Sequence, residues 1–112
     1  METRKDLTLY QAFKQAADKV PEETAIFYFD NKISFYKLDQ YINCWASILQ
    51  NDFNIQKGDS ILIALPNIPQ TLILFYAVNK IGGICNMVHP YTPEEGIQKY
   101  YDESNCKLAF LF

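Results

Sequence analysis

Two polar residues follow apolar runs of the sequence, at positions where a binding site could form. His89, the only histidine, comes directly after the run from Ile84 to Val88, and Asn67 comes shortly after the run from Ser60 to Leu65. In open α/β sheets, ligands bind outside the carboxyl ends of the strands. Both side chains are therefore candidates for substrate binding. The alternative, which we favour, is that they only bond to local backbone and cap the elements that follow.

The other reactive groups predict no catalytic or metal site. Glu94 and Glu95 could act as an acid–base pair, but acidic residues in the first turn of a helix usually complement its dipole. Gly82-Gly83 lacks the further glycines, Lys and Ser/Thr of a phosphate-binding loop, and a helix end is the simpler interpretation. The cysteines Cys44, Cys85 and Cys106 are odd in number and have no C-x-x-C spacing. We expect reduced thiols in a cytoplasmic protein.

Charge and the amino terminus exclude further classes of protein. The formal net charge is -3, and the basic residues are scattered rather than gathered in a stripe, so nucleic-acid binding is not expected. The start METRKDLTLY turns polar before any apolar stretch of secretory length, which predicts no signal peptide.

The segment from Ser60 to Asn79 contains no charged residue and is about as long as a membrane span. Pro66, Asn67 and Pro69 interrupt it where a spanning helix would need continuous backbone pairing, so we predict no transmembrane segment. Instead, 60–65 is typical of a strand buried on both faces. We expect Asn67 to cap a helix with Leu72, Phe75, Tyr76 and Asn79 on one face, ended by Gly82-Gly83. A second parallel strand follows at 84–88, which completes a β-α-β crossover.

Similar signals predict the remaining elements. Thr8 and Gln11 form a capping box for a helix whose apolar stripe includes Leu9, Phe13 and Ala17. The stretch 24–35 is typical of a hairpin that turns at Asp30-Asn31. Ser34 and Thr92 are expected to cap two further helices, and a last strand is expected at 107–112. The predicted class is α/β: a partial parallel sheet built from β-α-β crossovers with flanking helices, plus an N-terminal β-hairpin. Because the sequence stops within an apolar strand, we expect a fragment of a larger N-terminal domain, with exposed strand edges that promote self-association.

The order of several short motifs resembles the N-terminal part of the adenylate-forming (AMP-binding) enzymes, which include acyl-CoA synthetases, luciferases and peptide-synthetase adenylation domains. The motifs are ISFYKLDQYINCWASILQ, then IQKGDSILIALPNIPQTLILFYAVNKIGGICNMVHPYTPEE, then YYDESNCKLAFLF, and residues 24–112 follow the family pattern almost without gaps. Gln70 replaces the usual acidic residue, His89 the usual asparagine and Gly96 the usual leucine. These departures concern the subfamily rather than the superfamily.

The resemblance implies that residues 1–112 are the N-terminal part of the large AMP-binding domain of an acid–CoA ligase, of fatty-acyl type. ATP, Mg and coenzyme A would serve the full-length enzyme, with a carboxylic acid as substrate and the remainder of the same enzyme as partner. The family's phosphate loop, nucleotide-binding motifs and catalytic lysine have no counterpart here, so the 112-residue chain is expected to be inactive. Two alternatives stay open: an enzyme that loads a carrier protein, and a truncated, non-catalytic interaction module.

Overall fold

The structure, a computed structural model, describes residues 8–112 and confirms the predicted order of elements. Residues 1–7 lie outside this part, and with them most of the segment on which the signal-peptide prediction rests. The elements are α1 (Leu9–Lys19), β1 (Thr24–Tyr28), β2 (Asn31–Ser34), α2 (Phe35–Asn51), β3 (Ser60–Ala64), α3 (Pro69–Lys80), β4 (Ile84–Met87), α4 (Glu94–Glu103) and β5 (Cys106–Leu111).

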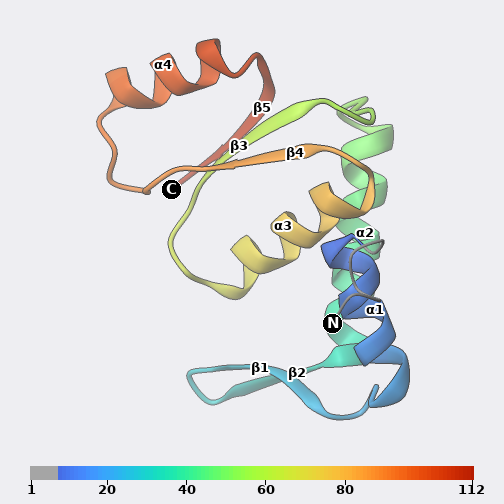
Figure 1. Cartoon of the computed structure of the whole chain (residues 1–112). Helices are drawn as coiled ribbons and strands as arrows, with labels where there is room; N and C mark the ends of the chain where they lie inside the picture. Colours follow the sequence, from blue (N-terminus) through green and yellow to red (C-terminus); the bar gives the residue numbers. More distant parts are fainter. Residues whose placement is uncertain (1–7) are drawn as a thin grey trace, which may run out of the picture.

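The predicted parallel sheet is confirmed, with β3 at its centre. The strand order is β4-β3-β5, and Ile63 lies opposite Met87 on one side and Phe110 on the other. Figure 1 shows α3 on one face of this sheet and α4 on the other. Because β3 has a strand on each side and a helix on each face, its last four residues are buried.

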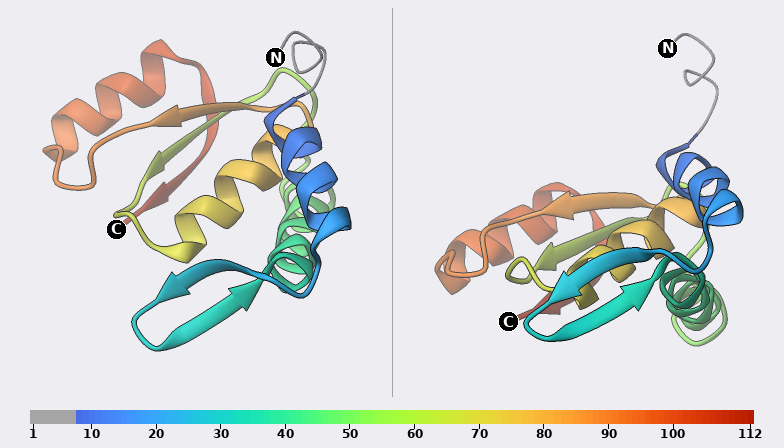
Figure 2. Two further views of the ribbon diagram at one scale, coloured as in Figure 1. Left: turned by 60° about the horizontal axis from the view of Figure 1, so that its bottom comes forward. Right: turned by 90° about the horizontal axis from the view of Figure 1, so that it is seen from below.

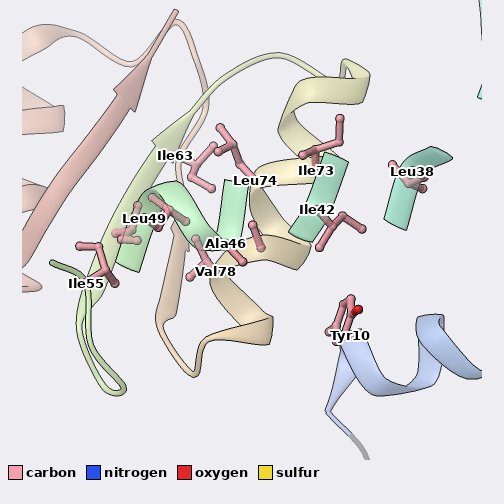
Figure 3. Close-up of a cluster of buried hydrophobic side chains, with 12 residues drawn as sticks. Tyr10, Leu38, Ile42, Ala46, Leu49, Ile55, Ile63, Ile73, Leu74 and Val78 are labelled. Carbon is pink, nitrogen blue, oxygen red and sulfur yellow. The ribbon is translucent and has the colours of Figure 1, made fainter. Parts of the chain in front are cut away.

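Alternate residues of β3 belong to two separate apolar clusters. Ile61 and Ile63 pack with residues of α2 and α3 in the larger cluster, part of which is drawn in Figure 3. Leu62 and Ala64 point to the opposite face, where Ile97 and Tyr101 of α4 cover them. This alternation follows from the two-residue period of a strand.

A buried polar network attaches α1 to the helices of the larger cluster. The Tyr10 hydroxyl donates to Oδ1 of Asp39 at 2.8 Å, and the Lys14 ammonium donates to Oδ2 of the same carboxylate at 3.0 Å. The Tyr10 N–H donates to Oδ1 of Asn79 at 2.8 Å. Asp39 is only 7% exposed, so these donors compensate the cost of burying its charge. The network therefore fixes α1 against both α2 and α3.

The hairpin forms a separate two-stranded sheet that projects from the helices, as Figure 2 shows. Its register shifts between Thr24 and Ile26, which indicates a β-bulge at Ala25. The prediction that the chain turns at Asp30-Asn31 is wrong by one residue. Phe29 carries the positive φ of 54°, and Asn31 already pairs with Tyr28. The pairing of Tyr28 with Asn31 makes Phe29 and Asp30 the turn residues, although Asp and Asn are the types that turns prefer.

Two of the predicted helix caps are confirmed and two are wrong. Thr8 and Ser34 cap α1 and α2 as expected, each accepting a backbone N–H three residues on. Asn67 does not cap α3, because the helix begins at Pro69 and its N-cap is Ile68, which makes no side-chain capping bond. Thr92 does not cap α4, because the N-cap is Pro93 and no side chain makes a capping bond there.

The predicted buried face of α3 is also wrong. Ile73, Leu74, Ala77 and Val78 are buried, whereas Leu72 is 36% exposed. Apolar residues surround most of this helix, so their period could not select the buried side. The expected ending of α3 is confirmed: Gly82 has φ of +82°, and the N–H of Gly83 bonds to the Val78 carbonyl.

The stripe predicted for α1 is partly wrong, since Leu9 is 55% exposed and Tyr10 is buried in its place. In residues 8–112, no helix combines the length and apolar character needed to cross a membrane.

Candidate functional site

The carboxyl ends of β3, β4 and β5 lie at one edge of the sheet, because the three strands are parallel. The segments 65–68 and 88–93 leave the sheet at this edge, and the chain ends there at Phe112 (Figure 1). We call these two segments and Phe112 the carboxyl edge. It contains both residues that the sequence offers as binding candidates.

Asn67 is exposed in the segment that joins β3 to α3. The turn around it is held by a residue that the sequence analysis did not consider, Thr71. The Thr71 hydroxyl donates to the carbonyl of Pro66 at 2.6 Å, and the N–H of Ile68 donates to the same carbonyl at 2.9 Å. The buried Thr71 side chain is therefore used to hold the turn, and Asn67 takes no part in these bonds and is exposed to solvent.

His89 is also exposed, but its ring is engaged by its own loop. Nδ1 accepts the N–H of Tyr91 at 3.1 Å, and the His89 carbonyl accepts the N–H of Thr92 at 3.0 Å. The ring centroids of His89 and Tyr91 are 5.8 Å apart, and those of Tyr91 and Phe112 are 5.9 Å apart. This geometry is what the local backbone-bonding interpretation of His89 expects.

The structure places His89 and Asn67 at the same edge but does not assemble them into a constellation. No hydrogen bond or ring contact joins the two residues in the described part of the chain. Tyr91 was missed by the sequence analysis. A side-chain acceptor two residues before its bonded N–H is the pattern of an Asx turn, which is usually sought only at Asn and Asp.

The residues present do not fit a metal ion. In residues 8–112, no group of three or more His, Cys, Asp or Glu side chains is arranged to hold one. Glu94 and Glu95 lie in the first turn of α4, as expected, and with Gln98 line a hollow on its surface. The carboxyl edge of this chain therefore supplies no ligand set for Mg²⁺.

The cysteines Cys44, Cys85 and Cys106 are free, as expected. Burial raises the pKa of the half-buried Cys85 to about 11, and burial likewise raises the pKa of Cys106. A raised pKa suppresses the thiolate, which is the nucleophilic form. Neither thiol is therefore suited to covalent catalysis.

A cavity of about 520 Å³ lies between the hairpin, α2 and the start of α3, where Pro69 directly follows the 65–68 segment of the carboxyl edge. Its walls combine aromatic and aliphatic side chains with three polar ones, and consist of Tyr28, Asn31, Lys32, Ile33, Tyr41, Trp45, Pro69, Gln70 and Ile73. These residues come from β1, β2, α2 and the more distant α3, so no single local motif could have predicted the cavity. It contains neither His89 nor Asn67.

Comparison with known proteins finds relatives among acyl-CoA ligases and peptide synthases. Bacillus subtilis long-chain-fatty-acid–CoA ligase is 36% identical over 89 residues, which is 79% of this chain and 16% of that enzyme. Tyrocidine synthase 2 of Brevibacillus parabrevis is 30% identical over 108 residues, 96% of this chain and 3% of the synthase. The chain thus spans less than a fifth of the length of these relatives.

Solved structures share the fold. The N-terminal subdomain of Klebsiella oxytoca NpsA superposes with a TM-score of 0.86 at 23% identity, over 93% of this chain and 27% of that one. The sequence profile of the family described as AMP-binding enzyme matches residues 13–111. The chain therefore belongs to the AMP-binding enzyme family.

Proposed function

We propose that this chain is the N-terminal part of the large AMP-binding domain of an ATP-dependent carboxylic acid–CoA ligase, of fatty-acyl type. The family match over residues 13–111 carries the proposal. The 36% identity to a long-chain-fatty-acid–CoA ligase supports the choice of acyl-CoA formation within the family.

The proposed reaction has two steps. A carboxylate oxygen attacks the α-phosphorus of ATP, which gives an acyl-adenylate and releases pyrophosphate. The thiol of coenzyme A then attacks the acyl carbon and releases AMP. Activation is needed because a free carboxylate is a poor electrophile, whereas AMP is a good leaving group.

In this proposal the described residues contribute scaffold rather than chemistry. The β3-α3-β4 crossover and β5 form the first strands of a parallel sheet, and its carboxyl edge presents short turns rather than a phosphate-binding loop. Mg²⁺ and the nucleotide would be held by residues outside this chain. His89 and Asn67 remain candidates for contact with substrate at that edge.

A second candidate keeps adenylate formation but transfers the acyl group to a carrier protein. The match to tyrocidine synthase 2 over 96% of the chain favours it. A non-catalytic interaction module is the third possibility, in which the open strand edges bind another protein or a second copy of the chain. In all three cases we propose a cytoplasmic protein with reduced thiols and no nucleic-acid partner.

The deciding experiment is to sequence the reading frame beyond the codon for Phe112 and assay its full product. Fatty acid, ATP, Mg²⁺ and coenzyme A should give the acyl-CoA thioester and pyrophosphate. Pyrophosphate release with amino acids, and none with fatty acids, would instead identify the carrier-loading enzyme. A stop codon directly after Phe112 would leave the interaction module.

A further inference from the structure

The loop between β4 and α4 is held by two hydrogen bonds to a single residue, His89. The first joins the Tyr91 N–H to Nδ1 of the imidazole, and the second joins the Thr92 N–H to the His89 carbonyl. The N–H of Val88, just before this turn, bonds to the Ile63 carbonyl at 2.9 Å. The turn is therefore a direct extension of the sheet, and His89 is the residue that closes it.

The side-chain bond fixes the protonation state of the ring. A ring nitrogen accepts a hydrogen bond only through its lone pair, so the imidazole must be neutral with its proton on Nε2. An asparagine at this position could accept the same N–H through its amide oxygen, as in an Asx turn. The amide keeps that acceptor at every ordinary pH, but a histidine loses it on protonation, because both nitrogens of the imidazolium are donors.

The titratable groups around His89 in the described residues are few. In residues 8–112, none of the ion pairs involves His89. The titratable groups on the elements next to His89 are the Tyr91 phenol in its own loop and the carboxylates of Glu94 and Glu95 in the first turn of α4. The neighbouring segment 65–68 has no ionisable side chain, and beyond the end of β5 the Phe112 ring contacts Tyr91.

We propose that His89 is a pH-sensitive positioning residue that closes the 89–92 turn when neutral and releases it when protonated. Histidine is the side chain whose charge ordinarily changes between about pH 5 and 8. Protonation removes the acceptor of the Tyr91 N–H, which frees the Tyr91 ring from its place between His89 and Phe112. The proposal concerns the turn itself and does not depend on the substrate of the enzyme.

The test is nuclear magnetic resonance of the ¹⁵N-labelled 112-residue chain between pH 8 and pH 5. His89 is the only histidine, so its imidazole signals need no assignment by mutation. At pH 8 we expect the tautomer with the proton on Nε2. The Tyr91 amide signal should shift with the same midpoint as the ring, and its protection from solvent exchange, corrected for intrinsic rate, should fall about fivefold as the ring is protonated.

His89→Asn is the matched control, because the amide oxygen can close the same turn without titrating. In that variant we expect the Tyr91 amide to keep its protection across the whole pH range. A proton on Nδ1 at pH 8, or a Tyr91 amide that is equally protected at pH 5 and pH 8 in the unsubstituted chain, would overturn the proposal. Both outcomes are read from the unsubstituted chain, so the test stands even if the variant fails to fold.

Discussion

The central strand β3 and the hairpin strand β1 are similarly apolar in sequence but are buried to very different degrees. The last four residues of β3 are completely buried, whereas Phe27 and Phe29 of the hairpin are 64% and 79% exposed. The difference lies in their neighbours. β3 has a strand on each side and a helix on each face, while each hairpin strand pairs once and only part of the hairpin packs on α2. Burial of a strand is thus set by what surrounds it more than by its own composition.

The largest expected effect separates these two regions directly. Ile63→Ala should lower the free energy of unfolding by about 2–5 kcal/mol, because it removes a fully buried side chain and leaves a cavity between β3 and the helices that cover it. Phe27→Ala removes a larger side chain but should cost less than about 1 kcal/mol, since its chief contact is Lys32, 5.9 Å from the ring centre. Guanidinium unfolding of both variants measures the contrast. Equal losses would mean that the hairpin is as well packed as the central strand.

The next effect concerns the network that attaches α1 to the larger cluster. Burial, followed by the hydrogen bond to Asp39, raises the pKa of Tyr10 from 10.0 to about 12. The folded state therefore favours the neutral phenol, so this contribution is complete below pH 10 and is lost as the pH rises through 12. We expect a loss of about 2–3 kcal/mol across that interval.

Tyr10→Phe is the control, because it removes the group that titrates. At pH 7 it should cost about 1–3 kcal/mol by taking a donor from the buried Asp39 carboxylate. Its stability should then fall less steeply than that of the parent between pH 10 and 12, as measured by denaturant unfolding at each pH. Parallel pH profiles for the two proteins would show that Tyr10 does not titrate as the structure implies.

A smaller effect, of opposite sign, is expected at the hairpin turn. Phe29 has a φ of 54°, in the left-handed region that costs a residue with a side chain roughly 1 kcal/mol and that asparagine tolerates better. Phe29→Asn should therefore raise the free energy of unfolding by up to about 1 kcal/mol, offset in part by loss of the ring contact with Tyr28. A melting temperature clearly below that of the parent would indicate that this exposed ring has a packing role.

The smallest effect belongs to an exposed ion pair at the start of the sheet. The backbone N–H of Gln56 and then the Lys107 ammonium, 3.1 Å away, lower the pKa of Asp59 below its usual 3.8. The carboxylate form is favoured in the fold, so the stabilisation is present above about pH 4 and is lost as the pH falls through the depressed value. Asp59→Asn should flatten the acid end of the stability profile, and Lys107→Gln should do so less. An unchanged profile in both variants would show that the pair contributes nothing measurable.

The sequence was sufficient to predict the order and type of the helices and strands. It was not sufficient to predict which face of each helix is buried or at which residue each helix begins. The strand at β3 and the ending of α3 at Gly82 were predictable because a continuous apolar run and a glycine with positive φ leave few alternatives. The buried face of α3 was not, because an almost wholly apolar helix has no polar side to point outward. Tertiary packing against α2 and β3 made that choice.

The candidate site was predictable only in position. Strand order and parallel pairing placed His89 and Asn67 at one edge, as the sequence suggested. The roles of Thr71 and Tyr91 were not visible, since both depend on where a neighbouring backbone group happens to point. The cavity between the hairpin, α2 and α3 depends on how α3 packs beside elements far from it in sequence, and it had no sequence signal.

Pyrophosphate exchange tests the central claim, that this chain is a scaffold of the AMP-binding fold without a catalytic group of its own. The purified 112-residue chain would be incubated with ATP, Mg²⁺, labelled pyrophosphate and a panel of fatty, aromatic and amino acids. We predict exchange no greater than in a control without protein. Exchange that rises with the amount of chain, depends on the acid and disappears when the chain is removed would contradict this account.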